Sequence, residues 1–136
     1  MSGRLAFSDS NILIYLVSDE AEKAAIAGEI LRDNLTISVQ VLNEIASVML
    51  GKLRRPWDEV ERVLALLRSV STIHPVDVRT HTVGMAVARR YQLGVYDSMI
   101  VAAALLADCD TLYSEDMQPG LVVENRLRIV NPFAAP

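Results

Sequence analysis

The chain has 136 residues, of which 51% are hydrophobic, and its formal net charge is −4. This length favours a single compact domain over residues 1–136, and no apolar run approaches the roughly 18 residues that a membrane span requires. Because the overall charge is negative, the chain cannot hold nucleic acid by bulk electrostatics, and a nucleic-acid substrate would require local arginines or bound cations.

The N-terminal half alternates between strand-like and helix-like segments. Residues 5–8 form a short apolar run that ends at Asp9, which is typical of a buried strand followed by a turn. A helix is expected over residues 21–31 and a second strand over residues 35–39. Residues 40–53 predict an amphipathic helix, because their apolar side chains recur at three- and four-residue steps.

The same alternation continues beyond a break in the middle of the chain. An amphipathic helix is expected around residues 60–67, followed by a strand over residues 72–76. A proline interrupts this strand and therefore predicts a position at the edge of a sheet. Asp77 is suited to cap a helix that reaches Tyr91, with Gly94 as its stop.

The C-terminal part completes the pattern of a layered fold. Residues 99–107 are apolar on every side, which indicates a helix buried on both faces, and strands are expected at residues 111–114 and 127–130. Strands that alternate with helices predict an α/β fold whose mostly parallel central sheet is covered on both faces. Ligands of such sheets bind beyond the carboxyl ends of the strands, and Asp9 and Asp116 both follow strand candidates at that edge.

Four acids are the candidate functional residues: Asp9, Glu44, Asp97 and Asp116. Each has an ordinary explanation when taken alone, as a turn residue, a helix cap or a solvated helix residue. Together at one edge, however, carboxylates repel one another and raise each other's pKa unless a cation joins them. Oxygen ligands suit Mg²⁺ or Mn²⁺, and a pair of such ions can promote the displacement of a phosphodiester.

Short motifs surround each of these acids. They are Phe7–Leu13 (FSDSNIL), Ser38–Glu44 (SVQVLNE), Tyr96–Ile100 (YDSMI) and Tyr113–Asp116 (YSED). In this order and spacing they resemble the four acidic motifs of PIN-domain nucleases, and the ending Leu127–Phe133 (LRIVNPF) resembles that of bacterial VapC-type toxins. The resemblance covers nearly the whole chain.

This resemblance implies a PIN-like three-layer α/β/α sandwich and a Mg²⁺- or Mn²⁺-dependent endoribonuclease that hydrolyses RNA phosphodiester bonds. Ser114 matches the small hydroxyl residue near the metal, Asn11 matches an amide that supports the site, and Ser10 stands where threonine is more usual. The VapC-type likeness also implies a toxin of a toxin–antitoxin pair, a VapB-type antitoxin partner and a homodimer. By position, the residues that match the catalytic and metal-binding quartet are Asp9, Glu44, Asp97 and Asp116.

The densest basic cluster is formed by Lys52, Arg54 and Arg55. Cations at the end of a helix are ordinarily solvated charges that suit the helix dipole. The alternative is contact with RNA phosphates outside the metal site, because arginine is a good fork-shaped phosphate donor. Both histidines, His74 and His81, are expected to be structural.

Two further features bear on the cellular compartment. The first ten residues contain no long apolar stretch after Arg4 and do not look like a secretory signal. Cys109 is the only cysteine, which excludes an internal disulfide and a cysteine-based metal site. A cytoplasmic location is therefore expected.

Other protein classes fit less well. A phosphate-transferring enzyme of the haloacid dehalogenase type would need a second aspartate where Asn11 stands, and a phospho-acceptor receiver domain would need adjacent acids after the first strand and a late lysine. Two alternatives within the PIN fold stay open. One is a free-standing RNA-processing nuclease, and the other is a catalytically silent scaffold that only binds a partner.

Overall fold

The computed structural model describes residues 5–134, so the outermost residues of the expected 1–136 domain, including the first four of its N-terminal segment, lie outside the described residues. The strands are β1 (Ala6–Ser8), β2 (Thr36–Ser38), β3 (Thr72–His74), β4 (Thr111–Tyr113), β5 (Val122–Val123) and β6 (Leu127–Val130). The helices are α1 (Ser10–Leu13), the 3-10 helix η1 (Ile14–Val17), α2 (Ala21–Arg32), α3 (Val39–Leu50), α4 (Trp57–Val70), α5 (Val78–Tyr91) and α6 (Val95–Leu106).

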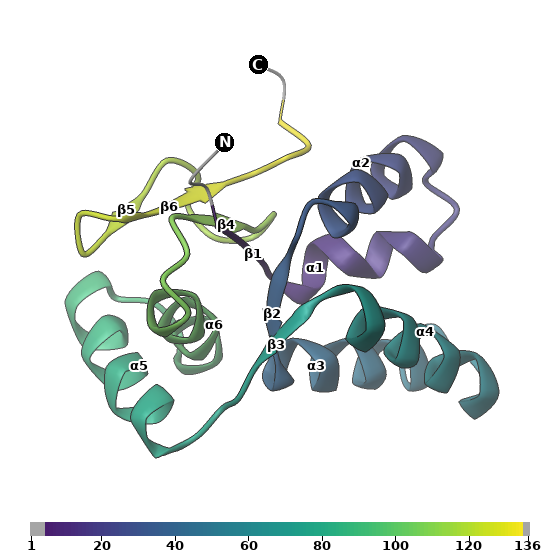
Figure 1. Cartoon of the computed structure of the whole chain (residues 1–136), viewed down its shortest axis with the longest axis horizontal. Coiled ribbons are helices and arrows are strands. Elements are labelled where there is room, and N and C mark those ends of the chain that lie inside the picture. Colours follow the sequence, from purple (N-terminus) through teal and green to yellow (C-terminus); the bar gives the residue numbers. More distant parts are fainter. Residues whose placement is uncertain (1–4, 135–136) are drawn as a thin grey trace.

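The strands form one sheet in the order β3-β2-β1-β4-β6-β5. Pairing is parallel from β3 to β6, and the short β5 pairs antiparallel with β6. Helices α5 and α6 lie on one side of this sheet, and α1, η1, α2, α3 and α4 lie on the other (Figure 1). The structure therefore confirms the predicted α/β class with a central, mostly parallel sheet between two helical layers, and it confirms β3 as an edge strand.

The register of the central strands brings two predicted site residues together. Ser8 at the end of β1 pairs with Tyr113 at the end of β4. The next residues, Asp9 and Ser114, therefore leave the sheet side by side at its carboxyl edge. The backbone N–H of Asp9 still donates to the Tyr113 carbonyl at 2.9 Å, which fixes where the turn after β1 begins.

Helix α6 is the most deeply buried element, as its sequence predicts. Every residue from Ser98 to Leu105 is buried, because α6 packs against the sheet on one side and α5 on the other. Gly84 allows the close approach of α5, since a β-carbon there would collide with the methyl end of Met99. This packing holds the start of α6, which carries Asp97, at the carboxyl edge of the sheet.

The boundary between α5 and α6 differs from the prediction. Asp77 caps α5 as expected, and its side chain and that of Thr80 form a reciprocal capping box. The helix ends at Tyr91 as predicted, but the left-handed residue that stops it is Gln92, with φ +56°, and not Gly94. Gly94 instead precedes the first turn of α6, so Asp97 lies inside that turn and is not its cap.

Sequence analysis did not predict β5. This strand has two residues and is joined to β6 by a tight turn at Glu124 and Asn125, which have φ values of 52° and 58°. Two consecutive positive φ angles are typical of a type I′ hairpin turn. Neither residue is glycine, and a two-residue strand has no readable alternation, so no local pattern marked the hairpin.

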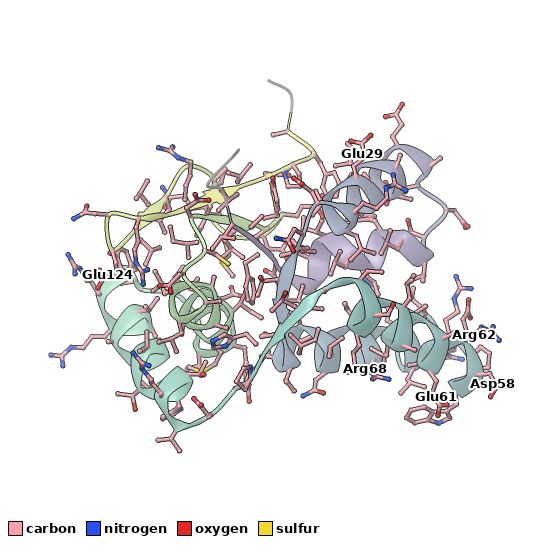
Figure 2. All side chains as sticks on the ribbon, in the orientation of Figure 1. Glu29, Asp58, Glu61, Arg62, Arg68 and Glu124 are labelled. Atoms are coloured by element: carbon pink, nitrogen blue, oxygen red, sulfur yellow. The ribbon has the colours of Figure 1, made fainter. Side chains whose placement is uncertain are left out.

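The outer surface is highly charged. Figure 2 shows labelled side chains that extend from the outer helices and the β5–β6 turn, and all of them are exposed: Glu29, Asp58, Glu61, Arg62, Arg68 and Glu124. Over residues 5–134, none of the helices combines the length and the apolar character needed to cross a membrane.

Candidate functional site

Asp9 is the buried centre of the candidate site. It follows β1 and caps α1, and its Oδ1 accepts a hydrogen bond from the Ser10 backbone N–H at 2.7 Å. Its Oδ2 accepts from Ser114 Oγ at 3.0 Å and lies 3.4 Å from Asn11 Nδ2. Burial is the main reason that the pKa of Asp9 rises from 3.8 to about 6; the hydrogen bonds from Ser114 and Ser10 lower it, and the charges of Glu44 and Asp97 raise it. Asp9 is only 4% exposed.

Glu44 is directed toward Asp9 by two neighbouring side chains. Ser10 Oγ donates to Glu44 Oε1 at 2.7 Å and also lies 3.4 Å from Asp9 Oδ1. On the same helix, Gln40 Nε2 donates to Glu44 Oε2 at 3.1 Å. Sequence analysis assigned no role to Ser10 or Gln40. The four-residue spacing of Gln40 and Glu44 on a predicted helix was a signal for the second of these contacts.

Asp97 approaches from the other helical layer. It lies in the first turn of α6 at the exposed rim of the site. Its carboxyl is partly withdrawn from solvent, and this burial raises its pKa, as do the negative charges of Glu44 and Asp116. Asp97 therefore lies within electrostatic range of acids from α3 and from the segment after β4.

The segment after β4 contributes a buried hydroxyl and an exposed acid. Ser114 is fully buried, and besides donating to Asp9 it accepts a hydrogen bond from the Met117 backbone N–H at 3.3 Å. Asn11 holds the same segment from the α1 side, because its Oδ1 accepts a hydrogen bond from the backbone N–H of Glu115 at 3.1 Å. Asp116 is exposed and faces the groove described next.

A groove of about 360 Å³ lies between α1, η1, α3 and the segment after β4. One part of its lining is apolar, and the other part carries carboxylates with a single cation, Lys52. A second hollow, of about 420 Å³, lies on the other side of Glu44 and is lined by Gln40, Asn43, Ser47 and the exposed Tyr96. The residues that line the first groove are Ser10, Asn11, Ile14, Tyr15, Glu44, Ile45, Val48, Lys52, Glu115 and Asp116.

The structure separates the three members of the predicted basic cluster. Lys52 lines the groove beside the acids. The Arg55 guanidinium instead binds Glu59 Oε1 at 3.3 Å and the Val17 carbonyl at 3.1 Å, so it connects α4 to η1. Arg54 is exposed in the connection between α3 and α4, where its φ is +52°. Lys52 is thus the cluster member that this fold brings to the candidate site.

The four acids reach one end of the sheet, yet they are not drawn into a tight cluster. Within residues 5–134, no three side chains of His, Cys, Asp or Glu lie close enough together to form a metal site as they stand. The chemistry of the donor set nevertheless fits a hard divalent cation. All the donors are oxygens, and a buried carboxylate with like charges nearby gains from a neighbouring cation.

Comparisons with known proteins agree with this fold. The family model described as PIN domain matches residues 6–119, a span that includes all four acids. A toxin–antitoxin complex from Klebsiella pneumoniae is 24% identical, with a TM-score of 0.73, 96% of this chain covered and 99% of that chain. The search of curated proteins gave no match.

Two more solved structures have the same fold at lower identity. The Mycobacterium tuberculosis toxin VapC20, described as cleaving the sarcin-ricin loop, is 15% identical with a TM-score of 0.66, covering 82% of this chain and 89% of that one. FitAcB from Neisseria gonorrhoeae is 12% identical with a TM-score of 0.67, covering 96% and 100%. With the family model spanning most of its length, the chain belongs to the PIN domain family.

Proposed function

We propose that this chain is a metal-dependent endoribonuclease and the toxin of a toxin–antitoxin pair. One observation carries the proposal: in a PIN domain, Ser10 joins Glu44 to the buried Asp9, and the charges of Asp97 and Asp116 act on the same group of acids. A protein that served only as a binding scaffold would gain nothing from a group of acids that raise each other's pKa.

The residues that would hold Mg²⁺ or Mn²⁺ are Asp9, Glu44, Asp97 and Asp116. When bound, such a cation lowers the pKa of water and stabilises negative charge on phosphate oxygens. The rest of the site acts on these acids. Ser114 and Asn11 fix the orientation of the Asp9 carboxylate, and Ser10 and Gln40 do the same for Glu44.

RNA is the proposed substrate, because bound divalent cations would allow this acidic groove to accept an anionic phosphate backbone. Lys52 supplies a further positive charge at the groove wall, where it is suited to contact a phosphate next to the cleaved bond. VapC20, which shares the fold, is described as cleaving the sarcin-ricin loop. For this chain we propose the substrate class, RNA, and no particular sequence.

An antitoxin is the proposed protein partner, since several solved relatives in fold are toxin–antitoxin complexes. The groove combines an apolar wall with carboxylates, which suits an apolar segment of a VapB-type antitoxin that also brings an Arg or Lys toward the acids. We place this pair in the cytoplasm.

A homodimer is the proposed assembly. Exposed apolar side chains gather at the starts of three helices, where an isolated chain would leave them in water. A second copy of the chain would bury them, and the candidate site beside them would then face the partner's site. The residues concerned are Val39 on α3, Val78 on α5, and Val95 and Tyr96 on α6, with exposures of 39%, 80%, 51% and 70%.

The test of the proposed function is RNA-end sequencing after brief expression of the intact chain, of Asp9→Asn and of a matched control, Asp33→Asn. Asp33 is an exposed aspartate at the end of α2. Fresh RNA ends with the intact chain and the control, but not with Asp9→Asn, are the expected result. If the fresh ends persist when a candidate antitoxin, encoded by any small open reading frame that adjoins the gene, is co-expressed, the free-standing nuclease is favoured. No fresh ends at all would favour a catalytically silent scaffold.

A further inference from the structure

Glu115 lies between two candidate site residues and is held by side chains from two other elements. Its Oε1 accepts from the Tyr15 hydroxyl at 2.6 Å, and its Oε2 accepts from Lys23 Nζ at 2.8 Å. Tyr15 belongs to η1, and Lys23 belongs to α2. Lys23 Nζ also lies 3.3 Å from the Tyr15 hydroxyl oxygen, so the three polar groups form a closed cluster.

Aromatic rings cover this cluster. Lys23 Nζ lies 4.7 Å from the centre of the Tyr15 ring and 5.1 Å from the centre of the Phe133 ring. The two rings meet edge to face at 5.1 Å, which brings the C-terminal segment against η1. Hydrogen bonds and ring contacts thus restrict the Lys23 side chain, although it remains 32% exposed.

The backbone of Glu115 is tied to the site as well. Its N–H donates to Asn11 Oδ1, and Asn11 in turn lies beside Asp9 and Ser114. The segment that carries Ser114 and Asp116 is therefore attached on one side through its backbone, at Asn11, and on the other through the Glu115 side chain. Movement of Glu115 would displace both neighbours relative to Asp9.

We infer that Glu115 is a positioning residue. Tyr15 and Lys23 hold its side chain, and the place of Glu115 sets how far Ser114 and Asp116 lie from Asp9. The inference rests on the proposed nuclease function for its kinetic part. A partly exposed ion pair contributes little to stability, so its loss acts mainly on the geometry of the site. Small displacements of reacting groups reduce turnover strongly while ground-state binding of the substrate changes little.

Lys23 has a competing interpretation as a direct contact to an RNA phosphate. The two roles differ in what they change. Loss of a phosphate contact raises KM for RNA and is insensitive to Tyr15, whereas loss of the positioning contact lowers kcat and is reproduced by removing the Tyr15 hydroxyl alone. Tyr15→Phe is therefore the central variant, because it deletes one hydroxyl and keeps the ring against Phe133.

The chain offers a close match for the control. In the last turn of α5, Tyr91 and Arg90 hold Glu124 by a similar combination of a tyrosine hydroxyl and a cation, with the Tyr91 hydroxyl and Arg90 Nη1 both 2.8 Å from Glu124 Oε2. Glu124 extends into solvent beside the end of α5 (Figure 2). Tyr91→Phe removes an equivalent hydroxyl–carboxylate bond without touching the candidate site.

The experiment measures kcat and KM for RNA cleavage by the parent chain, Tyr15→Phe, Lys23→Met, Lys23→Arg and Tyr91→Phe. The expected result is a fall in kcat of about 10-fold for Tyr15→Phe and Lys23→Met with KM within about twofold, recovery of kcat in Lys23→Arg, and parental values for Tyr91→Phe. Unchanged kcat in Tyr15→Phe, or a rise in KM confined to Lys23→Met, would overturn the inference.

A second readout needs no activity. Amide hydrogen exchange at Glu115 and Met117 reports the bonds to Asn11 Oδ1 and Ser114 Oγ. Tyr15→Phe should speed exchange at both amides about 10-fold, and Tyr91→Phe should not. If exchange responds but the parent chain cleaves no RNA, the proposed function fails and the positioning contact stands. If exchange does not respond, the positioning contact itself is refuted.

Discussion

The Ser10 hydroxyl donates a 2.7 Å hydrogen bond to Glu44, a residue 34 positions away in the sequence. Because the backbone N–H of Ser10 also donates to Asp9 Oδ1, one residue orients two acids that reach the site from different elements. Threonine is more usual at this position in the resembling motif, and threonine would keep the hydroxyl. We therefore expect the hydroxyl, and not the size of the side chain, to be the feature that orients Glu44.

We predict that Ser10→Ala lowers kcat for RNA cleavage by about 10-fold, because Glu44 loses a fixed orientation, and that Ser10→Thr retains most of it. Ser69→Ala is the matched control, since the Ser69 hydroxyl donates to the Leu66 carbonyl on the exposed side of α4. Steady-state kinetics on a labelled RNA provide the measurement. Equal activity of Ser10→Ala and the parent would show that Glu44 needs no such support.

The raised pKa of Asp9 predicts that the free energy of unfolding depends on pH when no metal is bound. Its pKa is raised to about 6 in the folded chain, so the folded state binds the proton more tightly than the unfolded state. Protonation of Asp9 contributes at most about 3 kcal/mol to the free energy of unfolding. This contribution is complete below about pH 4 and is lost as the pH rises through 6. The folded chain should thus lose stability mainly between about pH 4 and pH 6.

Asp9→Asn should remove most of this dependence and should be more stable than the parent at pH 7. Urea unfolding with chelator present, at several pH values, is the measurement. Asp33→Asn serves as the exposed control and should follow the parent. A parent chain that gains stability from pH 5 to pH 7 while Asp9→Asn does not would contradict the assigned direction.

RNA cleavage should require Mg²⁺ or Mn²⁺ and stop when a chelator is added. Asp97→Asn should reduce cleavage at least about 100-fold with the fold intact, because Asp97 is exposed at the rim of the site and its side chain forms no hydrogen bond with any of residues 5–134. Products should carry 5′-phosphate and 3′-hydroxyl ends. Mass spectrometry that instead finds 2′,3′-cyclic phosphates would mean that the ribose hydroxyl attacks, contrary to the proposed hydrolysis.

Lys52 should act on substrate binding. Lys52→Ala is expected to raise KM for RNA severalfold with little change in kcat, and to reduce the dependence of binding on salt. Arg62→Ala is the control, because Arg62 is an exposed cation on the outer side of α4 (Figure 2). If both substitutions raise KM equally, the effect reflects overall charge and not a contact in the groove.

Much of the fold could be predicted because its signals are local. The apolar run of α6 has no polar face, so its burial on both sides follows directly. The position of Asp9 after a short apolar strand likewise placed it at the functional edge of a parallel sheet. The proline after β3 correctly marked an edge strand.

Other features could not be predicted because they depend on distant contacts or unusual backbone. Gln92 takes a left-handed conformation that glycine usually provides, so the glycine nearby was a misleading stop signal. Arg55 is turned away from the site by Glu59 and a carbonyl of η1, which composition does not reveal. The contacts of Glu115 join segments about 100 positions apart, and no spacing rule connects them.

The order of the strands also constrains when the site can exist during synthesis. Strand β4 pairs with β1 in the middle of the sheet, yet residues 111–113 are made only after β1, β2, β3 and helices α1 to α6. Until they emerge, Asp9 lacks the Tyr113 carbonyl, Ser114 and the acid at position 116. A nascent chain therefore carries the first three acids without an assembled centre until β4 and the residues that follow it have been made.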